Sequence, residues 1–433
     1  MSMKAAVPLK AALCRRPLVS VVTLALVVRV AYWSIFHRHY VPASDAAHYH
    51  EIALNVAEGE GFFHFFPQLE EHATAFRPPL YPLLLSLPYR VLWPTVAIAQ
   101  VMNLVLGCAV VALTFVLVQR IAGRRAATVS AILASVYPPL LANDVVPLAE
   151  PLALCLLLGL ALCLRSQQFL GAGVLTGLLV LSRTSAQGVA VIVVLWVLAT
   201  LGKRQAAVAL AVAGLVVAPW VVRNQIALGT PTLVTSNGFN LAALHSPEAR
   251  ESGRFVDPVF DPRFEEFRIY QFDEVEWDRK LSSYAIAEIR RDPLASFDVV
   301  LRNLAAMAEL KPSYNASAER LDGRVAGLRT ASLPLFYAVS VVGVVGLWRH
   351  RADGSVRFLA VVTAYFLALS LLFVAPPRLR APFDLLSVIG VGLFVASAEA
   401  RRVSRRDVED AAGDDAGGAS SFAAPTEVLR RDP

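Results

Sequence analysis

Long apolar segments recur along this chain, and clusters of Arg and Lys flank most of them. A helix of about 20 residues crosses the hydrocarbon core of a bilayer, and segment 17–36 has that length and composition. Inside a bilayer every backbone N–H and C=O must be bonded within the protein, so such segments become helices. Since 56% of the residues are hydrophobic and only 17% are charged, the chain is a multi-pass membrane protein and not a soluble domain.

The apolar pattern predicts about ten membrane spans. They cover residues 17–36, 96–119, 126–141, 151–164, 168–182, 186–202, 205–222, 331–348, 356–375 and 381–398. Basic clusters at Arg15-Arg16, Lys203-Arg204 and Arg401-Arg402 then fall on one side, which the positive-inside rule assigns to the cytoplasm. The predicted fold is an all-α polytopic membrane bundle with both termini in the cytoplasm.

Two polar regions lie between predicted spans on the outer side, at residues 37–95 and 223–330. In the first, residues 80–93 are too short and too rich in Pro to cross a bilayer, which indicates an interfacial or re-entrant helix. The second carries amphipathic patterns at about 275–291 and 294–310, which predict two helices. Both outer regions are therefore expected to be largely helical.

Turn signals around Gly229-Thr-Pro and Asn237-Gly238 enclose a short β-branched run, which predicts a small hairpin there. Residues 1–398 are expected to form one transmembrane domain. Residues 399–433 are rich in Asp, Ala, Gly and Ser after the last basic cluster, which predicts a disordered cytoplasmic tail.

The basic residues accompany the apolar segments, so the net charge of +6 reflects topology and not nucleic-acid binding. The excess of Ala, Val, Leu and Arg, with only four Met, indicates a bacterial plasma-membrane protein from a GC-rich genome. The four cysteines have no metal-ligand or redox spacing.

Charged residues at the outer membrane edge define a candidate site, because charges at a bilayer are costly and need a reason. They are Asp45, Arg77, Asp144, Glu150, Arg183, Arg378 and Arg380. Guanidinium groups suit a phosphate, and a carboxylate can take a proton from a hydroxyl. This combination favours sugar transfer from a lipid phosphate, with the arginines stabilising the charge on the departing phosphate.

Ordered motifs resemble the GT-C glycosyltransferases, and most closely the branch of protein O-mannosyltransferases and lipid A aminoarabinose transferases. The motifs are Asp45-x3-Tyr49-x2-Ile52-Ala53, Gly59-x-Gly61-Phe62, Arg77-Pro-Pro-Leu-Tyr81-Pro, Glu150-Pro-Leu, Leu181-Ser-Arg183, Pro219-Trp220-x2-Arg223-Asn224, Asn237-Gly238 and Arg378-x-Arg380-x-Pro382. The resemblance covers most of residues 17–398. It implies an inverting transferase that uses a polyprenyl-phosphate sugar, hexosyl or pentosyl, on the extracytoplasmic side, for example a mannosyltransferase of the cell envelope.

The resemblance also implies roles for single residues. Asp45 matches the first-loop carboxylate proposed as general base, and Glu150 matches the second acidic position. The residues at positions expected to bind the donor phosphate are Arg77, Arg183, Arg378 and Arg380, and the possible substrate contacts are His48, Tyr49, Tyr81, Asp144 and Asn237. The acceptor is expected to be a glycan, a glycolipid or a protein. Protein O-mannosyltransferases often have an Asp-Glu pair where this chain has Asp45-Ala46, which argues against a protein acceptor.

The first outer loop also invites a metal hypothesis, since it is rich in His and places Asp45 and His48 three residues apart. The His spacings match no compact ligand motif, and relatives that use lipid-monophosphate donors generally need no metal, so no cofactor is expected. Activity that survives a strong chelator would remove the metal hypothesis.

Two other functions remain open from the sequence. A secondary transporter or flippase would place charges near the bilayer midplane and often shows an internal repeat. Here the charges gather at the outer edge, and no repeat relates the two halves. A scaffold protein would account for the amphipathic helices but would leave the Arg77-Pro-Pro loop unexplained.

Overall fold

The structure is a computed structural model that describes residues 16–63, 72–253, 255–267, 273–310, 322–373 and 375–418. Within these ranges the fold is helical, and its β-structure is one isolated bridge between Phe63 and Ala73. The predicted all-α class is therefore confirmed. His64 and the Asn315-Ala-Ser317 segment lie outside the described residues.

Seven helices of the described chain are long and apolar enough to cross a membrane. The membrane part contains α2 (Pro17–Phe36), α5 (Val96–Val136), α7 (Glu150–Arg165), α8 (Phe169–Ser182), α9 (Gln187–Leu201), α10 (Lys203–Leu228), α16 (Ala326–Arg349), α17 (Gly354–Leu372) and α18 (Ala381–Gly418). The predicted span 96–119 and most of the predicted span 126–141 fall within α5, whose backbone breaks at Ala122 and Gly123, where Gly123 takes φ 83°. The short α6 (Pro138–Asn143) follows, and α7, α8 and α9 are the shortest of these membrane helices, with 16, 14 and 15 residues.

Close helix contacts hold the bundle together, and α16 against α18 is the tightest of them. A Cβ on Gly346 would lie 1.9 Å from the carbonyl oxygen of Gly390, and one on Gly343 would lie 2.4 Å from that of Ser387. Between membrane helices, packing and not water exclusion drives association, so small residues at a crossing permit close backbone approach. This crossing anchors the start of α18 beside the candidate site.

A buried ion pair joins α2 to the segment before α7. Arg29, 1% exposed, places Nη2 at 2.8 Å and Nε at 2.9 Å from Oδ2 of Asp144. A Cβ on Gly107 would lie 2.4 Å from the same oxygen, so the glycine leaves room for the pair. Arg29 therefore faces the bundle and is neutralised there.

We predict that Asp144→Asn destabilises the protein by about 3 to 5 kcal/mol, because it leaves the Arg29 guanidinium buried without a counter-charge. Thermal unfolding in detergent measures the effect. Asp298→Asn is the matched control, since Asp298 is 65% exposed in an (i, i+4) pair with Arg302 and should change stability little. Equal stability of the two variants would contradict the account of this pair.

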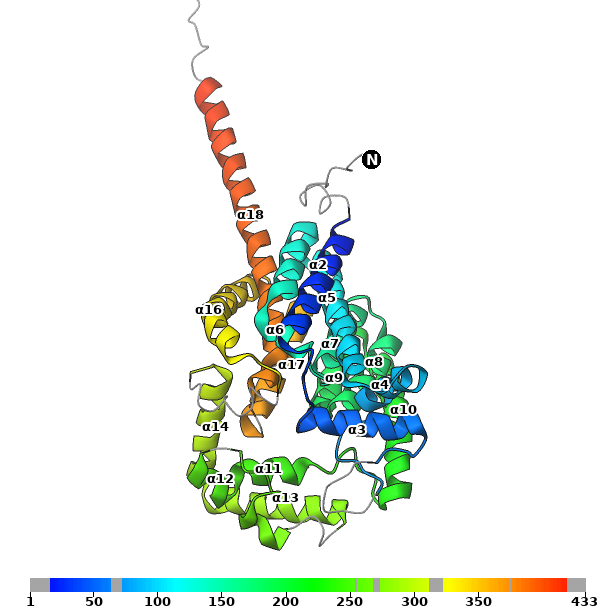
Figure 1. Ribbon diagram of the computed structural model, residues 1–433. Helices are drawn as coiled ribbons and strands as arrows, with labels where there is room; N and C mark the ends of the chain where they lie inside the picture. Colours follow the sequence, from blue (N-terminus) through cyan, green and yellow to red (C-terminus); the bar gives the residue numbers. More distant parts are fainter. Residues whose placement is uncertain are drawn as a thin grey trace, which may run out of the picture.

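The outer regions form a helical layer at the end of the bundle opposite the start of α2 (Figure 1). Its helices are α3 (Asp45–Glu58), α4 (Leu80–Val91), α11 (Asn237–His245), α12 (Pro247–Ser252), α13 (Glu274–Arg291) and α14 (Pro293–Met307), with the 3-10 turn η2 (Pro262–Phe267). The predicted helices at 80–93, 275–291 and 294–310 are found as α4, α13 and α14. The predicted hairpin is wrong: Asn237 and Gly238 begin α11, and Gly238 packs against the backbone of α13.

The layer has its own apolar core, and the first outer loop contributes to it. Phe76 and Trp277 are buried there, and the ring of Phe76 lies 5.4 Å from that of Phe239 and 6.3 Å from that of Trp277. Burial of Phe76 fixes the backbone of the next residue, Arg77, between this layer and the membrane helices.

The last helix, α18, extends beyond the bundle at the end where α2 begins (Figure 1). We expected order to stop at residue 398, but α18 continues to Gly418, through a segment that contains four Ala and four Arg, which favour helix, besides four Asp and three Gly. The structure thus places the start of α2 and the extension of α18 at one end, and the outer layer at the other.

Candidate active site

Asp45 is the first residue of α3, where the exposed N–H groups of the helix favour a negative charge. The preceding residue, Ser44, has φ 51° and ψ −127°, a conformation that residues with a Cβ rarely adopt. Such outliers persist only where the surroundings impose them, and they gather at functional sites. The surrounding structure therefore holds Ser44 in an unfavourable backbone conformation, which places the Asp45 carboxylate.

Two guanidinium groups hold this carboxylate. Nη2 of Arg77 lies 2.5 Å from Oδ1, and Nη2 of Arg378 contacts Oδ2. Although burial opposes ionisation, the two arginines hold the pKa of Asp45 well below its ordinary value. The Asp45 side chain keeps 24% of its surface exposed. It is a charged group that solvent or a substrate can reach.

Arg378 lies in the 3-10 turn η4 (Pro377–Arg380) and joins three carboxylates that are far apart in the sequence. Besides Asp45, its Nε lies 3.3 Å from Oδ1 of Asp322 and 3.9 Å from Oε1 of Glu150. Glu150 begins α7, and its Oε1 is 3.7 Å from Nη1 of Arg183 at the end of α8. We call these six residues, Asp45, Arg77, Glu150, Arg183, Asp322 and Arg378, the acid-arginine site. Its three carboxylates and three guanidinium groups balance in charge.

Five of the six residues were predicted from the sequence, and Asp322 was not. It precedes α16 in a polar stretch that belongs to none of the motifs above, so nothing in its spacing marks it. Its side chain is 7% exposed, and burial, opposed by Arg378 and Arg324, raises its pKa to about 6. Oδ2 of Asp322 has no hydrogen-bond partner within the described ranges.

The raised pKa predicts a pH-dependent stability. Between pH 4 and pH 6 the folded protein keeps a proton on Asp322 that the unfolded chain has lost, so stability falls as the pH rises through this window. Asp322→Asn should lack this fall, and its stability relative to the wild type should increase by about 2 kcal/mol from pH 4 to pH 7. Thermal unfolding at several pH values tests this. Parallel curves for the two proteins would show that Asp322 titrates normally.

The other predicted residues divide into neighbours of the site and residues that lie elsewhere. His48 accepts hydrogen bonds from Nε and Nη2 of Arg77 at 3.1 and 2.9 Å. The Tyr49 ring packs edge-on against Tyr81 at 5.1 Å, and the fully buried Tyr81 donates a hydrogen bond to Asn103. These contacts hold Arg77 and the two tyrosines in place, and a substrate contact for either tyrosine stays a prediction.

Asp144, Asn237 and Arg380 are not brought to Asp45. Asp144 pairs with Arg29, and Asn237 begins α11, where the adjoining Gly238 N–H donates to Asp278 in α13. Arg380 turns away from Arg378 and binds Asp384 and Glu309, both at 3.2 Å. These three residues therefore lie outside the acid-arginine site, and their predicted contacts with a substrate or with the donor phosphate stay predictions.

Glu274 in α13 positions the segment that carries Arg77, a role that was not predicted. Its carboxylate, 1% exposed, accepts hydrogen bonds from Thr74 Oγ1 at 2.6 Å, from the Ala75 N–H at 2.8 Å and from Thr235 Oγ1. His72 Nε2 lies 3.2 Å away. In the sequence this residue looks like an ordinary acidic group in the first turn of a helix.

We expect Glu274→Ala to destabilise the outer layer by about 3 kcal/mol or more, because buried donors on Thr74, Ala75 and Thr235 lose their acceptor. Limited proteolysis should then cut near residues 72–78. Glu276→Ala, on the same helix with its side chain 47% exposed, serves as control. Equal protection in both variants would contradict the positioning role.

Solved structures share this architecture. Archaeal oligosaccharyltransferase AglB from Archaeoglobus fulgidus, in complex with an inhibitory peptide and a dolichol-phosphate, matches with a TM-score of 0.51 and 15% identity, over 96% of this chain and 53% of that one. The chain has the GT-C membrane fold. It spans about half the length of the archaeal oligosaccharyltransferases that it matches.

Two further structures complete the comparison. The Archaeoglobus fulgidus oligosaccharyltransferase in complex with Zn and sulfate gives a TM-score of 0.50 and 16% identity, over 90% of this chain and 50% of that one. ArnT from Cupriavidus metallidurans, bound to undecaprenyl phosphate, gives a TM-score of 0.37 and 12% identity, over 89% and 78%. No family model matches the chain, and no curated protein matches it by sequence.

The Zn in that archaeal structure raises the question of whether this site fits a metal. Asp45, Glu150 and Asp322 each face the guanidinium of Arg378, which occupies the space between them. In the part of the chain that the structure describes, no group of three or more His, Cys, Asp or Glu residues is arranged to hold a metal ion. Arg378 thus pairs with the three carboxylates that could otherwise face a cation.

Proposed function

We propose that this protein transfers a sugar from a polyprenyl-phosphate carrier to an acceptor hydroxyl, with inversion at the anomeric carbon. The observation that carries the proposal is the partly exposed Asp45 carboxylate held between Arg77 and Arg378. A carboxylate that can take a proton from a hydroxyl thus lies beside guanidinium groups that can bind a phosphate. The dolichol-phosphate in the archaeal oligosaccharyltransferase, which shares the fold, supports a lipid-linked donor.

The arginines bind the donor phosphate and stabilise its departure. The phosphodiester of a polyprenyl-phosphate sugar carries one negative charge, and the released monoester carries more, so charge develops on the phosphate as the bond to the sugar breaks. Arg77, Arg183 and Arg378 are held in place by carboxylates, with side chains 13 to 17% exposed. Fixed donors in a partly dry site stabilise this charge without reorganising in the transition state.

Asp45 is the general base, and donor binding activates it. With both arginines on its oxygens, the carboxylate is too weak a base to accept a proton readily. A phosphate that draws Arg77 and Arg378 toward itself weakens their hold on Asp45 and raises its basicity. The acceptor oxygen then attacks the anomeric carbon, the bond from sugar to phosphate oxygen breaks, and the hydroxyl proton passes to Asp45.

The outer layer supplies the acceptor side of the site. The helix α3, which begins at Asp45, and the helices α11 to α14 lie at the bundle end opposite the start of α2 (Figure 1). With the N-terminus in the cytoplasm, this end is extracytoplasmic, and the protein acts at the outer face of a bacterial plasma membrane. The donor sugar is a hexose or a pentose, and the acceptor is a glycan, a glycolipid or a protein.

A reconstituted transfer assay tests the proposal. Proteoliposomes receive polyprenyl-phosphate donors with radiolabelled sugars and an extract of envelope glycans and lipids, and label on the acceptor is measured with and without a strong chelator. Label on an acceptor, undiminished by the chelator, is the expected result. Labelled donor that crosses the bilayer with its sugar still attached would favour the transporter or flippase instead.

A further inference from the structure

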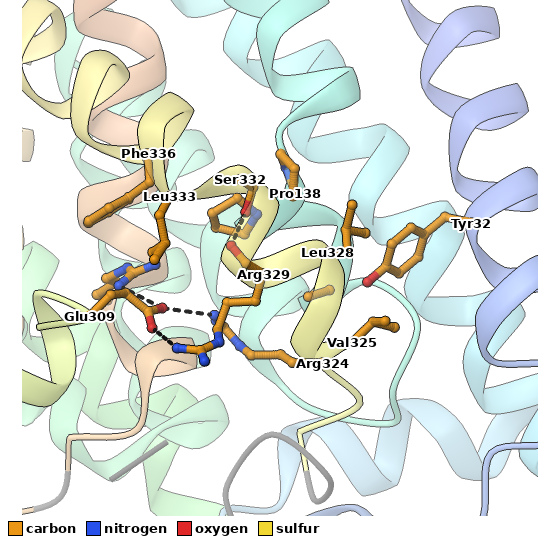
Figure 2. A pocket seen from close by; sticks show the side chains of 13 residues that line it. Tyr32, Pro138, Glu309, Arg324, Val325, Leu328, Arg329, Ser332, Leu333 and Phe336 are labelled. Carbon is orange, nitrogen blue, oxygen red and sulfur yellow. Dashed lines mark hydrogen bonds and ion pairs between the residues drawn. The ribbon is translucent and has the colours of Figure 1, made fainter. Parts of the chain in front are cut away.

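A second group of buried arginines lies beside the acid-arginine site, around Glu309 (Figure 2). The Glu309 carboxylate is 2.9 Å from Arg329, 3.2 Å from Arg380 and 3.7 Å from Arg324. Arg380 also pairs with Asp384 at 3.2 Å. These three guanidinium groups and two carboxylates leave one positive charge in excess.

These arginines and Glu309 line a pocket whose remaining walls are mostly apolar, with Ser332 as a polar exception. Figure 2 shows Leu333 and Phe336 of α16 on one side, and Leu328 of α16 beside Tyr32 of α2 on the other. The Arg380 guanidinium lies 4.0 Å from the centre of the Phe336 ring, so the aromatic face covers it. The pocket therefore has arginine side chains at one end and mostly apolar side chains along its walls.

Arg324 is incompletely paired, with Glu309 3.7 Å from its Nη1. Its side chain is 4% exposed, and its Nε and Nη2 make no hydrogen bond to any residue that the structure describes. Glu309, beside it, is held at φ 58°, in the left-handed region that residues with a Cβ rarely occupy. A buried guanidinium without acceptors is costly, and an anion that enters the pocket would satisfy it.

The surroundings indicate what kind of anion this is. The pocket lies at the start of α16, a candidate membrane span whose exposed face carries Leu335, Val341 and Trp348. Guanidinium groups bind phosphate oxygens through paired hydrogen bonds. We propose that this pocket binds the phosphate headgroup of a membrane lipid whose hydrocarbon chain lies along α16. The site is separate from Asp45 and does not rest on the proposed transfer reaction.

Native mass spectrometry of the full-length protein tests the proposal. The protein in detergent is titrated with a polyprenyl phosphate, with phosphatidylglycerol, with neutral diacylglycerol or with inorganic phosphate. Arg324→Gln should weaken binding of at least one phosphate lipid about tenfold, since a charged hydrogen-bonding group is lost. Leu333→Trp, which fills the pocket and keeps every charge, should do the same. Arg357→Gln, on the exposed face of α17, should bind as the wild type does.

The lipids distinguish two sources of the headgroup. If the pocket variants lose affinity for polyprenyl phosphate alone, the occupant is the carrier lipid. If they lose affinity for phosphatidylglycerol, the occupant is a phospholipid of the bilayer. Either result supports the proposal. Wild-type lipid affinity in both pocket variants, each folded by thermal unfolding, would overturn the proposal. So would binding of inorganic phosphate as tight as that of the lipids, since the apolar wall would then contribute nothing.

Discussion

Asp45→Asn should abolish transfer while the protein stays folded and still binds the donor. Asparagine has nearly the same shape, so packing at the start of α3 is kept, but an amide accepts no proton from the acceptor hydroxyl. Loss of a general base costs roughly 100- to 10,000-fold in rate. Because Arg77 and Arg378 lose their negative partner, both become more available to the donor phosphate, and donor affinity should hold or rise.

Two measurements separate this effect from a loss of folding. Single-turnover transfer measures the rate of the chemical step. Binding of labelled donor to the purified variant measures whether the arginines still bind the phosphate. Glu58→Gln, an exposed position at the end of the same helix, is the matched control and should transfer at the wild-type rate. Full activity in Asp45→Asn would remove the carboxylate from the mechanism.

Arg378→Gln should have the second largest effect, and it should act on both the donor and the site. Arg378 faces Asp45, Glu150 and Asp322 at once, so its loss leaves three carboxylates around a space without their shared cation. The phosphate also loses a fixed donor that is aimed at its developing charge. Removal of such a group typically costs roughly 100- to 1,000-fold in rate.

The conservative replacement makes this prediction specific. Arg378→Lys keeps the charge but loses the planar fork, so it should recover part of the lost rate without reaching the wild type. Arg357→Gln removes an exposed arginine of α17 and should leave transfer unchanged. If Arg378→Gln transferred sugar normally, or if it bound the donor as tightly as the wild type, the phosphate role would be wrong.

The sequence was sufficient for the membrane class and for much of the site, because local patterns specify both. Apolar length predicted a helical membrane bundle, amphipathic spacing identified α13 and α14, and charges at a predicted membrane edge pointed to Asp45, Arg77 and Arg378. These are signals that a residue carries together with its near neighbours.

The parts that could not be predicted depend on contacts between distant segments. Arg29 and Asp144 are 115 residues apart, and Glu274 meets Thr74 across 200 residues, so neither partner identifies the other in the sequence. Arg378 and Arg380 belong to one motif but sit in a 3-10 turn, where residues two apart point in different directions. One guanidinium therefore reaches Asp45, and the other reaches Glu309.

The most direct test of the account is the simultaneous measurement of both products in a single turnover. Wild-type protein in proteoliposomes is mixed with a polyprenyl-phosphate sugar labelled in the sugar and in the phosphate, and the anomeric configuration of the glycosylated acceptor is read by NMR. The account predicts one polyprenyl phosphate released for each sugar transferred, with inverted configuration. Retained configuration, or cleavage of the donor without a glycosylated acceptor, would contradict it.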